Sequence, residues 1–326
     1  MSRARASQER PRRRAPPDGA HVAAPDLQRR ALLVSAASAL LGAACKREER
    51  PGPPRTTASG EPGRWRELHF PAGDAYPEEE LATVLVAKGR PLLVALHGRG
   101  EAGRGLEAGA RGWRDEYELG RADERLRAPP LRAEDLLGLV RPERLAHLNE
   151  SLRASPFEGL CVACPYCPVL ADASETGARP FGRFVTEQLL PTVRREVGCA
   201  AGRTRTGIDG VSMGGRLALL VGLSHPEQFA SIGALQPAVR ESEAEMWSAL
   251  ARRARSRAEI ALRLVTSDED FFRPAVEKLS ERLRADGVAH ELLLTPGPHD
   301  YVYNRGPGSF EMLLWHERVL RGLAAP

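Results

Sequence analysis

The stretch GIDGVSMGG, residues 207–215, decides the fold. Within it, Gly210-Val211-Ser212-Met213-Gly214 fits the pattern G-x-S-x-G. The segment before it, RTGID, is typical of a strand, and the segment after it, GGRLALLVGLSHP, is typical of a helix. A tight strand–turn–helix connection places a serine hydroxyl at the carboxyl edge of a sheet, above a helix N-terminus. Ser212 is therefore a candidate nucleophile, although the bare pattern also arises by chance.

Short apolar runs alternate with helix-like segments on both sides of this stretch. Seven runs predict strands, at residues 83–87, 91–98, 159–166, 205–212, 231–238, 260–267 and 290–297. Four segments predict helices, at residues 182–197, 214–226, 242–256 and 273–287. Runs that are apolar almost throughout are typical of strands covered on both faces of a parallel sheet. The sequence therefore predicts an α/β fold with a doubly wound, mostly parallel sheet in one domain, residues 65–326. Pro191 predicts a kink or break in the first helix.

A long polar segment, residues 99–158, follows the second predicted strand. It is rich in arginine and glutamate and only partly helical in pattern. Connections of this length commonly form a cap or a lid that faces substrate. We expect an insertion of that kind.

A general base and its carboxylate partner are expected downstream of Ser212, because a serine hydroxyl needs a base to remove its proton. His299, in LLLTPGPHDYVY, follows a strand and a Pro/Gly turn and is the candidate base. Strand 260–267 ends directly in DEDFF, which makes Asp270 the candidate acid and Asp268 the alternative. The same acidic cluster also fits a solvated loop. The order serine, acid, histidine is that of α/β-hydrolases.

Donors for an oxyanion are expected from the loop HGRG, residues 97–100, which follows an apolar strand. The backbone N–H groups of Arg99 and Met213 are the candidate pair. The side chain of His97 is expected to brace this loop without transferring a proton. Three aromatic residues are candidates for lining a substrate pocket or for simple packing: Trp113, Tyr117 and Tyr301.

Taken together, these motifs resemble the esterase family that includes esterase D, feruloyl and related carbohydrate esterases. The stretches that carry the resemblance are LLVALHGRGE, GIDGVSMGG, TSDEDFF and the later TPGPHDY. The similarity covers roughly residues 90–305. It implies an α/β-hydrolase fold with an insertion after the HGxG strand, and a serine carboxylesterase that needs no cofactor or metal. Small-molecule or carbohydrate esters would be hydrolysed through an acyl-enzyme formed by Ser212, Asp270 and His299. An acyltransferase on the same scaffold and a non-catalytic surface lipoprotein are the alternatives.

The amino-terminal segment, residues 1–45, has the pattern of an export signal. Arg29-Arg30 precedes an uncharged, apolar run, as in twin-arginine signals. LLGAAC resembles a lipobox, in which Cys45 would be lipidated and become the mature amino terminus. Residues 46–64 are rich in Pro, Gly and charge and are interpreted as a linker. We therefore expect an exported, periplasmic or cell-envelope protein with a lipid anchor.

The charge distribution argues against nucleic-acid binding. Residues 1–30 contain eight arginines and three acidic residues, a charge of +5, which leaves −1 for the rest of a chain whose net charge is +4. The domain therefore has no basic excess to neutralise phosphates.

Four further cysteines, Cys161, Cys164, Cys167 and Cys199, leave several alternatives open. In an oxidising compartment they could form two disulfides, with three connectivities, or remain free thiols in the core. The C-x2-C-x2-C spacing also invites a metal site. However, Cys161 and Cys164 lie in one predicted strand at an odd offset and so point to opposite faces. A metal site is therefore not expected.

Overall fold

Eight strands form one sheet in the computed structural model, which describes residues 64–73 and 76–326. Their order is β1-β2-β4-β3-β5-β6-β7-β8, antiparallel from β1 to β4 and parallel from β4 to β8. The strands are β1 (Trp65–Phe70), β2 (Glu80–Leu85), β3 (Leu92–Leu96), β4 (Cys161–Pro165), β5 (Thr206–Gly210), β6 (Ser231–Leu235), β7 (Ala261–Glu269) and β8 (Glu291–Pro298). The predicted α/β fold with a mostly parallel sheet is confirmed, and β1 is an additional strand.

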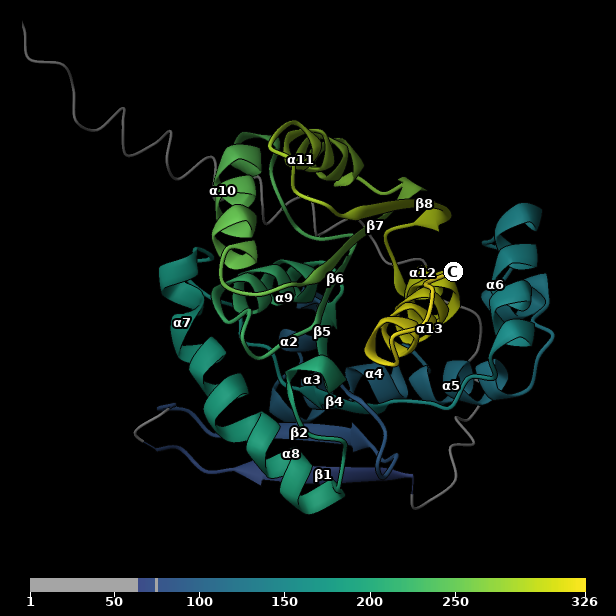
Figure 1. Cartoon of the computed structure of the whole chain (residues 1–326). Coiled ribbons are helices and arrows are strands. Elements are labelled where there is room, and N and C mark those ends of the chain that lie inside the picture. The colour runs from purple at the N-terminus through teal and green to yellow at the C-terminus, as the bar shows by residue number, and fades with distance from the viewer. Residues whose placement is uncertain (1–63, 74–75) are drawn as a thin grey trace, which may run out of the picture. The chain divides into compact units, whose positions relative to one another are not determined.

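Helices cover both faces of the sheet (Figure 1). One face carries α7 (Glu175–Arg183), α8 (Leu190–Val197), α9 (Met213–Ser224), α10 (Ala244–Arg255) and α11 (Arg273–Ala285). The other carries α5 (Leu119–Arg127), α6 (Pro142–Ala154) and α13 (Ser309–Leu320). Neighbouring residues of β3 belong to different cores, Val94 to the first and Ala95 to the second. This alternation explains why the central strands are apolar throughout.

Pro191 does not end the helix in which it lies. A π-helical segment, η2 (Phe184–Leu189), joins α7 to α8 directly before the proline. Proline cannot donate the i→i−4 hydrogen bond, and a π-helical turn is one way to accommodate the loss. The helical region also begins earlier than predicted, at Glu175, after the N-cap Ser174.

The insertion forms much of the second helical layer, contrary to the expected lid. Three short helices precede α5 in the chain: α2 (Arg99–Ala102), α3 (Leu106–Ala110) and α4 (Gly112–Asp115). A fourth, η1 (Ala133–Leu136), lies between α5 and α6. Leu119, Ala122 and Leu126 of α5 are fully buried at helical spacing, in the same core as Phe310 of α13. Most of residues 99–158 therefore support the fold, and only their beginning reaches the predicted site.

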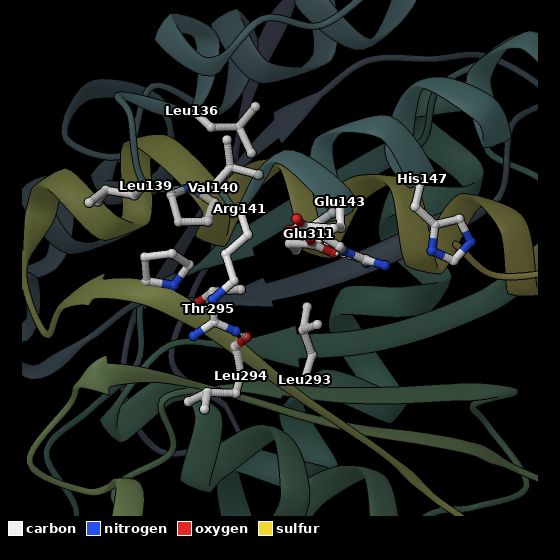
Figure 2. A pocket seen from close by; sticks show the side chains of 13 residues that line it. Leu136, Leu139, Val140, Arg141, Glu143, His147, Leu293, Leu294, Thr295 and Glu311 are labelled. Carbon is white, nitrogen blue, oxygen red and sulfur yellow. Dashed lines mark hydrogen bonds and ion pairs between the residues drawn. The ribbon is translucent and has the colours of Figure 1, made fainter.

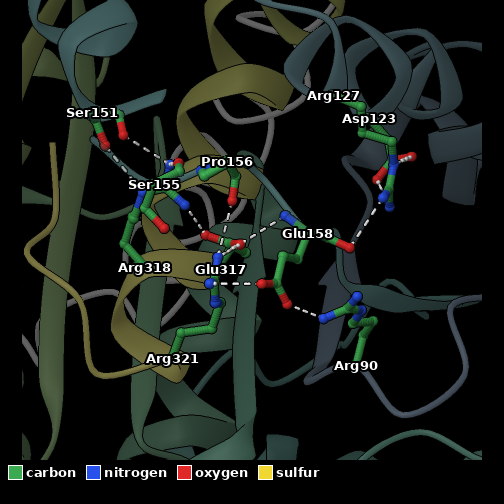
Figure 3. Close-up of polar contacts among 10 residues, drawn as sticks. All are labelled: Arg90, Asp123, Arg127, Ser151, Ser155, Pro156, Glu158, Glu317, Arg318 and Arg321. Carbon is green, nitrogen blue, oxygen red and sulfur yellow. Dashed lines mark hydrogen bonds and ion pairs between the residues drawn. The ribbon is translucent and has the colours of Figure 1, made fainter. Parts of the chain in front are cut away.

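A network of ion pairs fixes the end of the insertion to the rest of the domain (Figure 3). The Glu158 carboxylate pairs with Arg90, just before β3, and with Arg321 after α13 (2.9 Å). The buried carboxylate of Glu317 in α13 accepts from the Glu158 N–H (2.9 Å) and from Arg321 (2.6 Å). Glu317 is completely buried and also pairs with the buried Arg318, so its charge is compensated by two arginines, and losing both would leave an uncompensated charge in the core.

Cys161 and Cys199 form a disulfide that joins the start of β4 to the connection between α8 and β5. Cys164 and Cys167 are free and buried, and burial raises the pKa of both thiols. Cys161 and Cys164 belong to opposite cores, as the odd offset predicted. Among the described residues, no group of three or more ligand side chains could hold a metal ion.

The predicted export signal, residues 1–45 with Cys45, and nearly all of the linker 46–64 lie outside the described residues. The residues that are described all belong to one compact unit. In that part of the chain, no helix has the length and apolar character needed to cross a membrane.

Candidate active site

Ser212 lies at the turn between β5 and α9 with a backbone conformation that is rare for a residue with a side chain, φ 57° and ψ −116°. The two glycines of the motif are required by close packing. A Cβ atom on Gly210 would lie 2.5 Å from the carbonyl oxygen of Gly214, and one on Gly214 would lie 2.3 Å from that of Leu96. The turn is therefore strained at the one residue that is the candidate nucleophile, as in a nucleophile elbow.

The HGRG loop lies directly beside this turn. β3 and β5 are neighbours, with Leu96 opposite Gly210, and Val211 N–H donates to the Leu96 carbonyl (3.0 Å). Arg99 and Met213 are the first residues of α2 and α9, so their N–H groups have no partner within those helices. Two helix N-termini therefore converge beside Ser212, where a developing negative charge would be stabilised.

His97 braces the loop, as predicted. Its Nε2 accepts from the Cys167 N–H (2.8 Å), so Nδ1 carries the proton and donates to the Gly98 carbonyl (2.8 Å). The ring is completely buried, and burial lowers its pKa. His97 is therefore neutral and has no free nitrogen with which to transfer a proton.

Tyr117 contributes to the same loop through a hydrogen bond that the sequence did not suggest. Its hydroxyl accepts from the Gly98 N–H (3.2 Å) and donates to the buried carboxylate of Glu101. Burial and the Glu101 carboxylate raise the pKa of Tyr117. Trp113 is completely buried and packs edge-on against Tyr117, whereas the Tyr301 hydroxyl lies beside Gly100. Of the three aromatic candidates, Trp113 and Tyr117 are thus buried core residues, whereas Tyr301 is partly exposed.

Asp270 and His299 are brought together because they follow neighbouring parallel strands, β7 and β8. His299 Nδ1 lies 2.8 Å from Asp270 Oδ1, and the carboxylate is buried. Asp270 also accepts from the Phe272 N–H (2.9 Å) at Oδ1 and from the Thr266 hydroxyl (2.7 Å) at Oδ2. With Nδ1 donating to the carboxylate, Nε2 of His299 is left with its lone pair free. Asp268 instead accepts from the Gly297 N–H (2.9 Å), with Arg141 3.9 Å away.

Two phenylalanines surround the imidazole of His299. The Phe271 ring lies 4.4 Å from the His299 ring, centroid to centroid, and the Phe272 ring lies 5.4 Å from it. Phe271 is 54% exposed, whereas the His299 side chain is only 13% exposed. An exposed aromatic ring therefore shields the candidate base from solvent.

Ser212 and His299 follow strands that are three positions apart in the sheet, and the residue after β6 connects them. Ser212 N–H donates to the Leu235 carbonyl (2.9 Å). The next residue, Gln236, donates from Nε2 to the Pro298 carbonyl (3.0 Å), immediately before His299. Within residues 64–73 and 76–326, no hydrogen bond joins the Ser212 hydroxyl to His299. Gln236 was not predicted, because no motif marks a single polar residue at the end of a strand.

A second serine–histidine–aspartate array lies in the core. The Ser231 hydroxyl lies 2.7 Å from His316 Nδ1, and His316 Nε2 lies 2.9 Å from Asp209 Oδ2. Ser231 and His316 are completely buried, and burial lowers the pKa of His316. Asp209 Oδ1 accepts from the Gly210 N–H (2.7 Å). This array therefore supports the elbow from within the core and is closed to substrate.

A pocket of about 310 Å³ lies away from these residues, between β8, α6 and α13 (Figure 2). Its walls include Leu139, Leu294 and Arg141, and none of the predicted site residues lines it. The Arg144 guanidinium in its wall pairs with the buried Glu311 carboxylate through two hydrogen bonds (2.8 and 2.5 Å). The charges of Arg144 and Glu311 are thus already neutralised within the protein.

The sequence matches the family model described as "Putative esterase" over residues 167–300. No curated protein matches the chain. Solved structures that resemble it include a ferulic acid esterase (TM-score 0.58, 15% identity), an S-formylglutathione hydrolase from Staphylococcus aureus (0.54, 16%) and the fluorophosphonate-binding serine hydrolase F of the same organism (0.55, 15%). Each alignment covers 78% of this chain and 98% of the other.

The matched segment contains Ser212 and Asp270 and ends just after His299. At such low identity, the structural similarity establishes the fold alone, and it agrees with the observed sheet order and the turn at Ser212. The resemblance predicted from the sequence motifs is confirmed. We conclude that residues 167–300 match the model of this esterase family and that the chain has the α/β-hydrolase fold.

Proposed function

We propose that the protein is a serine carboxylesterase that hydrolyses carboxylic esters through a covalent acyl-enzyme. Ser212 is the nucleophile, His299 the general base and acid, and Asp270 the carboxylate that orients His299. The backbone N–H groups of Arg99 and Met213 bind the oxyanion. The proposal rests on the 2.8 Å contact between His299 and Asp270 at the same sheet edge as the strained, partly exposed Ser212.

The reaction follows from the chemistry of these groups. His299 Nε2 takes the proton of the Ser212 hydroxyl as Oγ attacks the ester carbonyl carbon, and the carbonyl oxygen becomes an oxyanion between the two N–H groups. Collapse of this intermediate breaks the ester bond, and the leaving alkoxide takes the proton from His299. Water then attacks the acyl-enzyme with His299 as its base, which releases the carboxylic acid and restores Ser212.

An active-site-directed fluorophosphonate tests this proposal. The wild-type protein should be labelled and should hydrolyse p-nitrophenyl acetate, whereas Ser212→Ala should do neither. Ser256→Ala is the matched control, because Ser256 is an exposed serine at the end of α10 and its loss should leave the labelling site intact. Equal labelling of wild type and Ser212→Ala would contradict the assignment of the nucleophile.

Esters of small molecules or carbohydrates are the proposed substrates, with short acyl groups preferred. The similarity to structures of a ferulic acid esterase and an S-formylglutathione hydrolase supports small esters as a starting point for a screen. p-Nitrophenyl esters of increasing chain length, with feruloyl and acetyl-sugar esters alongside, would measure the preference. A rate that rises with chain length would contradict the expected short acyl group.

Export and lipid anchoring through Cys45 are proposed from the sequence alone. The basic segment, the short apolar run and LLGAAC support an exported lipoprotein of the periplasm or cell envelope. Mass analysis of the mature amino terminus should find diacylglycerol on Cys45, and Cys45→Ala should release the protein from the membrane fraction. An unmodified peptide that contains Cys45 would contradict the anchor.

A further inference from the structure

Gln236 lies in an unusual place and conformation. It directly follows β6, the strand between the one that leads to Ser212 and the one that leads to Asp270. Its side chain is completely buried, and its φ of 43° is in the left-handed region, which a residue with a Cβ rarely adopts. Backbone strain that the surroundings maintain is typical of functional sites.

The hydrogen bonds of this residue join the end of β6 to β7 and to the end of β8. Its N–H donates to the Val265 carbonyl (2.6 Å), and Nε2 donates to the Ser267 hydroxyl (2.6 Å) and to the Pro298 carbonyl (3.0 Å). Because the Pro298 carbonyl can only accept, the amide nitrogen must face it. The side chain therefore holds the loop that carries His299 against the end of β7.

The backbone on either side of Gln236 holds the nucleophile. The Leu235 carbonyl accepts from Ser212 N–H (2.9 Å), and Ala238 N–H donates to the Ser212 carbonyl (3.0 Å). Gln236 is thus linked to both reacting groups through one intervening residue. Leu235, its chain neighbour, accepts from Ser212, and Pro298, its hydrogen-bond partner, directly precedes His299. Asp270 fixes only the Nδ1 side of the imidazole.

We propose that Gln236 is a positioning residue that sets the distance between His299 and Ser212. The inference rests on the esterase activity proposed above. A displacement of about 1 Å at a reacting group costs up to ~10²-fold in rate. Gln236→Met keeps the length of the side chain but removes its donors, and should lower kcat by 10- to 100-fold with little change in KM. Gln236→Glu keeps the shape, replaces the donor that faces Pro298 by an acceptor, and should lose activity similarly.

The test is a double-mutant cycle with His299→Ala, measured by hydrolysis of p-nitrophenyl acetate and by the rate of fluorophosphonate labelling. Gln236→Met should reduce both rates in the wild-type background and change the residual rates less than twofold in the His299→Ala background. A general loss of structure would reduce the rates in both backgrounds. The matched control is Gln228→Met, beyond the far end of α9, which should change neither rate.

Three outcomes would overturn the inference: a loss below threefold in the wild-type background for both Gln236 variants, an equal loss in both backgrounds, or a change confined to KM. If the wild-type protein neither hydrolyses esters nor reacts with the fluorophosphonate, the proposed function itself fails, and this inference fails with it. Activity in the wild type with unaffected Gln236 variants overturns the inference alone.

Discussion

Replacing Asp270 by asparagine removes the charge beside His299 but should keep the geometry. Oδ1 of Asp270 accepts from both His299 Nδ1 (2.8 Å) and the Phe272 N–H (2.9 Å). Since both partners donate to one atom, the asparagine oxygen should take this position. The Thr266 hydroxyl, which now donates to Oδ2, can rotate to accept from the new NH2 group. The imidazole therefore keeps the tautomer that leaves Nε2 free.

The magnitude follows from the charge that is lost. An imidazolium–carboxylate pair with the centres of its delocalised charges about 4 Å apart is worth about 4 kcal/mol at an effective dielectric constant of ~20. The neutral hydrogen bond that remains is worth about 1 kcal/mol. The net loss of about 3 kcal/mol predicts that Asp270→Asn lowers kcat/KM about 10²-fold. Had the NH2 group faced the histidine instead, the wrong tautomer would cost ~10⁴-fold.

Steady-state hydrolysis of p-nitrophenyl acetate by wild type, Asp270→Asn and Asp268→Asn measures this difference. Asp268 is the control, because its carboxylate accepts from Gly297 and does not contact His299. Its variant should stay within threefold of wild type. A loss below tenfold for Asp270→Asn would refute the assignment of the acid, and a loss of ~10⁴-fold would refute the argument about amide orientation.

Three further predictions concern other parts of the molecule. Phe271→Ala should lower kcat/KM for benzyl acetate about tenfold relative to methyl acetate. The leaving alcohol must pass His299, so its benzyl group would contact the exposed Phe271 ring. A contact that buries about 55 Å² of apolar surface is worth this factor. An unchanged ratio would exclude that contact. Reducing the Cys161–Cys199 disulfide, whose cysteines are 38 residues apart, should lower the free energy of unfolding by about 3–4 kcal/mol in denaturant titrations; equal curves with and without reductant would contradict this. Burial raises the pKa of Glu80 from 4.5 to about 8, so the folded state favours the protonated carboxyl and stability should fall as pH rises from about 4.5 to about 8. Glu80→Gln should reduce the difference in Tm between pH 5 and pH 8. If the difference in Tm is as large as in the wild type, other titratable groups must cause the pH dependence.

The parts of the fold and of the site that follow from local sequence pattern were predictable. Seven strands were predictable from their apolar runs, including β8 at the opposite edge of the sheet, whereas β1 alternates charged with apolar residues in WRELHF. The positions of Asp270 and His299 follow from strand ends that meet at one edge. Cys199 as the partner of Cys161, and Gln236 as a link between loops, depend on how distant segments pack. The Arg- and Glu-rich composition of the insertion concealed the leucines that α5 buries.

The buried Ser231–His316–Asp209 array has a practical consequence. A template search for three hydrogen-bonded side chains of these types would select it and pass over Ser212, whose hydroxyl has no such bond in the part of the chain described. Mutagenesis could repeat the error, since losing His316 would disturb Asp209 and the peptide of Gly210, and with them the turn above. The inactivity of a His316 variant could then be mistaken for the loss of a general base. A covalent label that reacts with a solvent-accessible serine would distinguish the buried Ser231 array from the site at Ser212.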